Sequence, residues 1–131
     1  NRALQETQDK VGAFHQQPTM VFCSTPQCAN TFGMEKAAAK AVGNLGLLVA
    51  PRGWKEVSLP PELIHHRQAE EWGNIAMLTK PKWLVEGMAY SLSDDPRPKL
   101  SEPFQQWRAQ FKRWHQQNPD PNIWHATEKV K

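Results

Sequence analysis

Long hydrophobic runs and a strong charge imbalance are both missing from this 131-residue sequence. The longest apolar run, residues 45–50, is interrupted by Gly46 and falls far short of the roughly 20 residues that cross a bilayer, which excludes a membrane-spanning segment. Sixteen Lys and Arg against 13 Asp and Glu leave a net charge of +3, too small to indicate nucleic-acid binding by itself. With 39% hydrophobic and 22% charged residues, the composition predicts one folded domain over residues 1–131.

Cysteine is nearly absent: the sequence has only Cys23 and Cys28. A zinc site built on cysteine would need a second pair. The short loop between them contains Pro26 and can bring two Cα atoms within the roughly 4.4–6.8 Å of a disulfide. We expect that disulfide, with two free buried thiols as the alternative. A disulfide and a chain that starts at Asn1 favour a periplasmic or extracellular protein whose signal peptide was removed, although a trimmed tag would leave a similar start.

Hydrophobic periodicity predicts an α+β fold, in which a small sheet from the first half of the chain packs against several helices. Ser58 is expected to cap the helix that begins near Pro60, because serine is a preferred cap and proline tolerates the first turn. Pro81 is expected to open the next helix, which ends before Asp94. Helices are expected over residues 2–16, 34–42, 60–72, 81–92 and 101–117, strands over 19–23 and 45–50, and a surface loop from 118 onward.

Polar residues suited to a site gather on two of these expected helices. Glu62, His65 and His66 are spaced at i, i+3 and i+4, so they share one side of the first helix. An antiparallel second helix would bring Glu86 opposite His65. Imidazole nitrogens and carboxylate oxygens are zinc ligands, and an open fourth position holds the reactive water. The spacing therefore predicts a metal site with ligands from both helices.

The same two segments resemble the active-site helices of zincin-type zinc metallopeptidases. Residues 61–68, Pro-Glu-Leu-Ile-His-His-Arg-Gln, are similar to the His-Glu-x-x-His helix. Residues 81–89, Pro-Lys-Trp-Leu-Val-Glu-Gly-Met-Ala, are similar to the Trp-x-x-Glu-Gly-x-Ala helix of the gluzincin group. The resemblance covers residues 54–96. It implies hydrolysis of a peptide or similar amide, with Glu62 as the general base that activates zinc-bound water, and His65 and Glu86 as metal ligands.

Position 61 departs from that motif, because Pro61 stands where the first histidine ligand should be. Proline has no side-chain donor, and even the loss of groups around a ligand typically costs about 10–100-fold in metal affinity. His66 lies about 100° around the helix from His65 and does not simply replace the missing ligand. A site shifted to His66, Glu62 or Glu70 is the alternative.

The resemblance therefore implies a peptidase-like domain that is impaired or inactive, with zinc held weakly or lost. The alternative is a pseudopeptidase that binds a peptide or protein partner in the same cleft. Tyr90 falls four residues after Glu86 on the same side, so it is a candidate to donate to Glu86 or to a reacting oxygen; a packed core tyrosine is the alternative. For His65 and His66 the simpler interpretation is a pair of hydrogen-bonded helix histidines, and for Glu86 an exposed carboxylate.

The last expected helix has an aromatic stripe that we interpret as core: Phe104, Trp107, Phe111 and Trp114. Basic residues on the same helix raise a further hypothesis, an interaction module that docks an acidic polymer. No nucleic-acid motif accompanies them, so no nucleic-acid partner is expected. Asp94 and Asp95 are interpreted as a helix-ending turn rather than a calcium site, because calcium takes six to eight oxygen ligands.

Overall fold

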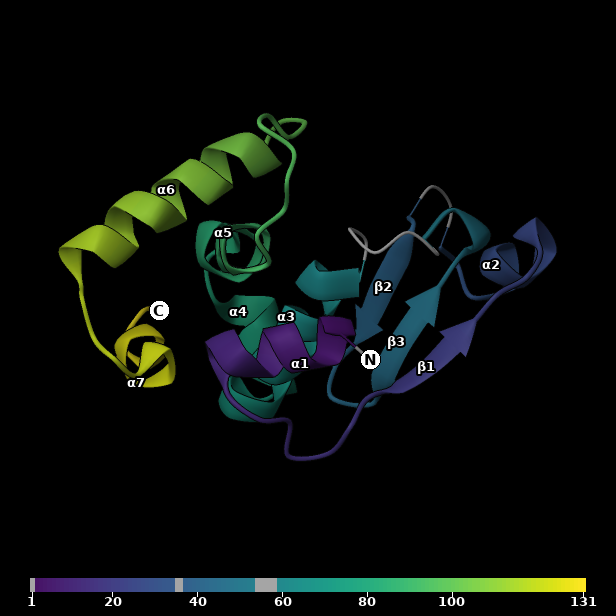
Figure 1. Cartoon of the computed structure of the whole chain (residues 1–131), viewed down its shortest axis with the longest axis horizontal. Coiled ribbons are helices and arrows are strands. Elements are labelled where there is room, and N and C mark those ends of the chain that lie inside the picture. Colours follow the sequence, from purple (N-terminus) through teal and green to yellow (C-terminus); the bar gives the residue numbers. More distant parts are fainter. Residues whose placement is uncertain (1, 35–36, 54–58) are drawn as a thin grey trace.

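The computed structural model describes residues 2–34, 37–53 and 59–131, and it confirms the α+β class. Figure 1 shows the sheet on one side of the molecule and most of the helices on the other, with α6 and α7 farthest from the sheet. The elements are α1 (Arg2–Val11), β1 (Thr19–Phe22), α2 (Pro26–Thr31), β2 (Ala39–Val42), β3 (Gly46–Val49), the 3₁₀ turn η1 (Pro51–Gly53), α3 (Leu59–Trp72), α4 (Asn74–Thr79), α5 (Lys82–Leu92), α6 (Phe104–Gln117) and α7 (Ile123–Glu128).

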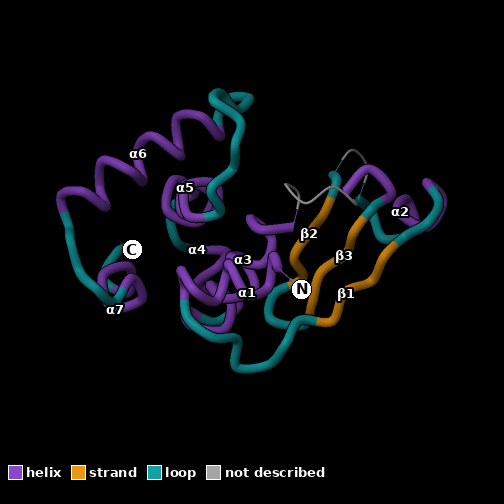
Figure 2. The backbone as a smooth tube through the Cα atoms, in the orientation of Figure 1, coloured by secondary structure: helices purple, strands orange, loops and turns teal. Residues whose placement is uncertain are grey.

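Within the described residues the sheet has three strands in the order β1-β3-β2 (Figure 2). β1 runs parallel to β3, and β2 runs antiparallel to it with Ala41 opposite Leu47. Leu47 and Val49 are buried on the sheet face that α3 covers. β1 and β3 approach closely at Gly46, where a Cβ would lie 2.2 Å from the Thr19 carbonyl oxygen. The central strand is therefore buried, while β2 forms an exposed edge beside α3.

The main hydrophobic core lies where α1, α3, α5 and α6 meet. Its buried members are Val11, Ile64, Leu84, Met88, Ala89 and Phe111. α5 and α6 pack tightly because Gly87 has no side chain: a Cβ there would lie 2.3 Å from the Trp107 carbonyl oxygen. Phe111 is fully buried and Trp114 packs against this core, as predicted for the aromatic stripe. The other two stripe residues, Phe104 and Trp107, are half-buried and lie outside this core.

The disulfide between Cys23 and Cys28 is present, with their Cα atoms 5.4 Å apart. Thr25 caps α2 inside this loop, since its side chain accepts a hydrogen bond from the Cys28 backbone N–H. This confirms the expected pairing and excludes the two free thiols. Among the described helices, none has the length and apolar character needed to cross a membrane.

The helix expected over residues 34–42 is wrong, because residues 39–42 form strand β2. Alanine favours a helix locally, but strand formation depends on the partner, and β3 supplies one. Residues 35 and 36 lie outside the described part of the chain, as does the predicted cap Ser58. The first helix ends at Val11 rather than residue 16, since Gly12 takes a left-handed φ of +87° that terminates helices.

The expected loop after residue 118 is also wrong in part, because residues 123–128 form α7. Asn122 caps this helix: its side-chain oxygen accepts from the backbone N–H groups of Trp124 and His125. The short helices α2 and α4 were not expected either. Their length of six residues each gives too little periodicity to detect from sequence.

Candidate functional site

A cavity of about 580 Å³ lies among β2, α3, α4 and α5, and we call it the central cavity. Glu62 and His65 of α3 and Glu86 of α5 all line it. Apolar side chains make up much of the remaining lining, together with two lysines. These other lining side chains include Ala39, Lys40, Ala41, Met77, Leu78, Lys82, Val85, Tyr90 and Phe104. The structure therefore brings together the three residues that carry the metallopeptidase resemblance.

His65 is fixed through both ring nitrogens. Its Nε2 lies 3.2 Å from Glu86 Oε2, and its Nδ1 lies 2.8 Å from Gln68 Oε1. The Gln68 amide donates from Nε2 to the Val85 carbonyl at 3.0 Å, so its oxygen is the atom that faces His65 and accepts from Nδ1–H. Both ring nitrogens thus face acceptor oxygens, an arrangement that suits a protonated imidazolium.

The electrostatics of the cavity agree with that assignment. Burial opposes charge on His65, but the hydrogen bond to Glu86 and the charges of Glu62 and Glu86 outweigh it and raise the pKa of His65 to about 9. Burial would also raise the pKa of Glu86, yet the hydrogen bond and charge of His65, with Lys82 nearby, lower it. His65 and Glu86 therefore form an ion pair at neutral pH.

Glu62 ties α3 to the edge of the sheet. Its Oε2 accepts a hydrogen bond of 2.7 Å from the Ala41 backbone N–H, which satisfies an outward-facing donor of the edge strand β2. Burial raises the pKa of Glu62, and the charge of His65 and the bond from Ala41 offset this only in part. Glu62 thus has a raised pKa, as a general base would, but its carboxylate is engaged by the backbone.

Tyr90 lines the same cavity and packs against aromatic and cationic neighbours. Its ring meets Phe104 edge-on at 5.3 Å between centroids, and the Arg97 guanidinium lies 5.9 Å from its centre. Burial, with the negative charges of Glu62 and Glu86, raises the pKa of Tyr90 to about 12. The hydroxyl therefore stays protonated, and Tyr90 can act as a hydrogen-bond donor beside the cavity while its ring packs.

A zinc site with three protein ligands does not fit these residues. The described part of the chain contains no group of three or more His, Cys, Asp or Glu side chains placed to hold a metal. His65 and Glu86, 3.2 Å apart, have the spacing of one pair of zinc ligands, since two ligands on tetrahedral zinc at about 2.0–2.1 Å lie roughly 3.4 Å apart. Pro61 is buried at the start of α3 and has no donor atom.

His66 lies on the other side of α3, away from the central cavity. Its Nε2 faces the Gln16 carbonyl at 3.3 Å and Glu70 Oε2 at 3.7 Å. Its Nδ1 has no hydrogen-bond partner among the described residues. Adjacent helix residues are rotated by about 100°, so His65 and His66 point to different surroundings. The structure therefore brings His66, proposed as a metal ligand, near Glu70 of the alternative shifted site, but not into the cavity that the other candidate ligands line.

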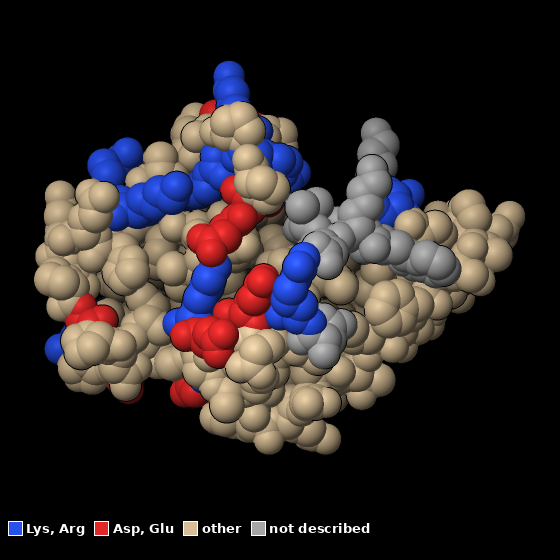
Figure 3. All heavy atoms as spheres, viewed as in Figure 1, with Lys and Arg blue, Asp and Glu red and all other residues tan. Residues whose placement is uncertain are grey.

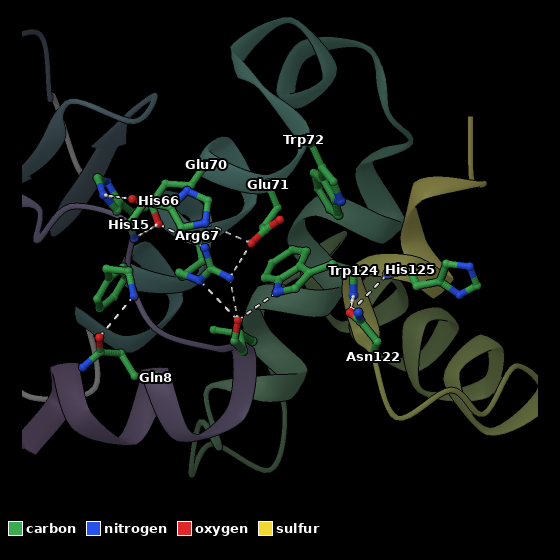
Figure 4. A network of polar contacts seen from close by, with 12 residues as sticks. Gln8, His15, His66, Arg67, Glu70, Glu71, Trp72, Asn122, Trp124 and His125 are labelled. Atoms are coloured by element: carbon green, nitrogen blue, oxygen red, sulfur yellow. Dashed lines mark hydrogen bonds and ion pairs between the residues drawn. The ribbon is translucent and has the colours of Figure 1, made fainter.

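That opposite side of α3 carries a polar network centred on Arg67, which Figure 4 shows close up. Arg67 Nε and Nη2 donate to the Val11 carbonyl at 3.2 and 3.0 Å. Its other donors reach Glu70 at 3.1 Å and Glu71 at 2.8 Å, and its guanidinium stacks 5.1 Å from the Trp124 ring centre. This network joins α1, α3 and α7, which are distant in sequence.

Glu70, an alternative ligand in a shifted site, is committed to the same network. Its carboxylate accepts from the backbone N–H groups of His15 and Gln16 at 3.1 and 3.0 Å. Burial would raise the pKa of Glu70, but these two bonds and the one from Arg67 lower it. The only sequence signal for this network is the placement of acids three and four residues after Arg67.

Charge on the surface is distributed unevenly. Figure 3 shows basic side chains gathered over α6, whereas acidic and basic side chains alternate over α1. Arg108 of α6 is buried and donates to the carbonyls of Arg97 and Pro98, so it supports the preceding loop rather than a ligand. Asp95 pairs with Arg97 and Asp94 with Lys10, and Asp94 takes a left-handed φ of +52° in the turn after α5.

No protein-family model, curated protein or solved structure matches this chain. The resemblance to zinc metallopeptidases therefore stays a prediction from the two sequence segments. Sequence reasoning singled out Glu62, His65, Glu86 and Tyr90, all of which line that cavity. It missed two further groups. Gln68 follows His65 by three residues on α3, a spacing that could have indicated the contact, whereas the backbone of Ala41 meets Glu62 only through the tertiary fold.

Proposed function

We propose that this chain is a zincin-like domain that binds a peptide segment of a partner in the central cavity without hydrolysing it. The observation that carries the proposal is the direct contact between His65 and Glu86, at 3.2 Å, combined with Pro61 at the position of the missing ligand. A protonated His65 placed between two carboxylates supplies the positive charge that a metal would otherwise supply. The protein would act outside the reducing cytosol, since its disulfide persists in oxidising compartments.

The shape and chemistry of the cavity support a peptide as the ligand. β2 is an edge strand and contributes Ala39 and Ala41 to the cavity lining. An exposed strand edge offers backbone groups to an extended peptide, while apolar pockets accept its alternate side chains. Met77, Val85 and Phe104 provide such apolar lining. Peptide binding therefore requires no metal and uses only groups that the cavity already presents.

A zinc titration tests the loss of the metal. We expect the metal-free wild-type chain to bind no zinc by calorimetry, and Pro61→His to gain zinc affinity by orders of magnitude because it restores a third ligand. Pro61→Ala is the matched control, since it changes the backbone in the same place but adds no donor. Near-stoichiometric zinc in wild-type protein purified without chelator, lost in Glu86→Ala, would contradict the proposal.

Peptide binding is tested with a random library of short peptides, analysed by mass spectrometry after equilibrium capture on the immobilised chain. We expect a retained subset that is recovered uncut. Ala39→Trp should abolish retention because the indole fills the cavity, whereas Gln110→Trp on the exposed face of α6 should leave it unchanged. Equal retention by both variants, or cleavage of the retained peptides, would overturn the proposal.

A second candidate function is residual zinc-dependent hydrolysis. The observation that favours it is the orientation of His65, whose Nδ1 is held by Gln68 and whose Nε2 faces the cavity, as a ligating histidine requires. Cleavage of library peptides by Pro61→His with added zinc, but not by Pro61→Ala, would show that the remaining machinery is intact.

A further inference from the structure

Three aliphatic side chains project from the surface beside the central cavity. Leu45, Ile75 and Leu78 are 75%, 78% and 82% exposed, whereas the other exposed large hydrophobic residues of the described chain are 39–52% exposed. Exposing a large aliphatic side chain so fully leaves its apolar area in water without compensation from packing. A group of such residues at one place marks a surface that meets an apolar environment.

The three residues belong to two neighbouring segments, the tip of the β2–β3 hairpin and helix α4. The Asn74 side chain at the start of α4 contacts Asn44 of the hairpin tip at 3.5 Å. Gly43, Asn74 and Leu78 line the same cavity. None of the six residues of α4 is buried, so the apolar side chains of α4 are not explained by core packing.

Most of the charged residues that flank these segments are cations. Residues 41–51 and 72–79 contain no charged side chain. Lys40, Arg52 and Lys80 adjoin them and Lys82 follows closely, whereas the one adjoining acid, Glu71, is paired with Arg67. Lys80 is used internally, because its ammonium donates to backbone carbonyls of the C-terminal segment. Lys40 and Lys82 are exposed, line the cavity, and form no ion pair with another described residue. The apolar surface is thus bordered by cations that remain available.

We propose that Leu45, Ile75 and Leu78, with Lys40 and Lys82 at their border, dock the domain on an anionic lipid surface. Separate side chains that each expose most of their area suit a bilayer, which accepts them without matching pockets. A protein partner would need a complementary cavity for each one. Lysines beside an inserted apolar group keep their ammonium in the headgroup region and attract anionic lipid. Docking would turn the mouth of the central cavity toward the membrane, although it does not depend on the proposed peptide binding.

Vesicle co-sedimentation of the full chain tests this docking. We expect binding to vesicles that contain phosphatidylglycerol and much weaker binding to phosphatidylcholine alone. Leu45→Ser/Ile75→Ser/Leu78→Ser should reduce the partition coefficient between water and vesicles about tenfold or more, because each removed aliphatic group no longer gains free energy by moving from water into the lipid. Lys40→Gln and Lys82→Gln should each reduce it about fivefold at low salt, and added salt should reproduce that loss in the wild type.

The matched control is Phe22→Ser, which removes an exposed apolar side chain from the end of β1 that lies opposite Val49, away from the hairpin tip. The control should leave vesicle binding unchanged. If circular dichroism shows that the triple variant does not fold, Leu78→Ser alone replaces it in the vesicle assay. Absence of binding to anionic vesicles would overturn the proposal. An equal loss of vesicle binding in the control would overturn it too. Self-association of the wild-type chain in solution, abolished in the triple variant, would identify a protein interface and would also overturn it. Peptide capture is measured without lipid, so a failure of the proposed peptide binding can be distinguished from a failure of the proposed lipid docking.

Discussion

The two sides of helix α3 contain the same residue types and use them differently. On the cavity side, His65 pairs with the carboxylate of Glu86 and has 9% of its side chain exposed. On the opposite side, His66 is 1% exposed and faces a backbone carbonyl. His65 and Glu86 line the central cavity, whereas His66 and Glu70 bond to the backbone of residues 15 and 16 and hold that segment against α3. A rotation of about 100° along one helix separates these two roles.

The largest effect is expected from Arg67→Ala on the buried side. The substitution removes the Arg67 donors from Glu70, the partly buried Glu71 and the Val11 carbonyl. Glu70 keeps its two backbone donors and the Val11 carbonyl keeps Trp124 Nε1, but the buried charges lose their cation. Breaking a buried ion pair by removing one partner typically costs about 3–5 kcal/mol. Urea unfolding should therefore show a loss of that size, while Arg113→Ala on the exposed face of α6 should change stability by less than about 0.5 kcal/mol. A loss below about 1 kcal/mol for Arg67→Ala would show that the two sides of α3 do not differ as described.

The pH dependence of stability should reveal the charge on the cavity side. The pKa of His65 is raised from 6.5 to about 9 on folding, so its contribution is fully present below about pH 6.5 and is lost as pH rises through about 9. That shift corresponds to a contribution on the order of 3 kcal/mol. The difference in unfolding free energy between wild type and His65→Gln, measured across this window, should shrink as pH rises. A difference independent of pH would mean that His65 is neutral in the folded protein.

Two substitutions of Glu62 distinguish its hydrogen bond from its charge, and their effect on stability is expected to be smaller. Glu62→Gln keeps an oxygen that accepts from the Ala41 N–H, so it should change the free energy of unfolding by less than about 1 kcal/mol. Glu62→Ala leaves that N–H without its partner and should cost about 1–3 kcal/mol. Thermal and urea unfolding of the pair provide the measurement. Equal losses would indicate that the charge of Glu62, rather than its hydrogen bond, stabilises the edge of the sheet.

The smallest effect is expected from His125→Gln, on the exposed surface of α7. His125 Nδ1 lies 2.7 Å from Asp120 Oδ2, at the surface. Surface ion pairs contribute about 0–1 kcal/mol, so urea unfolding should change by no more than that. A larger loss would mean that α7 is held by this contact rather than by Arg67 and Trp124.

Much of the helical half could be predicted from sequence. The helix expected over residues 60–72 is α3, because its signals are local: prolines in the first turn and a glycine after the last. β2 could not be predicted in this way, since an alanine-rich segment becomes a strand only beside β3. The candidate site follows the same division. Glu62, His65 and Gln68 share a face by helical spacing alone, whereas Ala41 became a partner of Glu62, and Val85 a partner of Gln68, only through packing.

Local spacing and residue chemistry were enough to determine the α+β class, the short-loop disulfide, and a helix that presents Glu62 and His65 together. They were also enough to show that Pro61 offers no metal ligand. The tertiary structure alone decided that Glu86 meets His65 at 3.2 Å and that His66 faces away. It also decided that Leu45 comes beside α4. Contacts between segments distant in sequence depend on how helices and strands pack, and helical or strand periodicity carries no information about that packing.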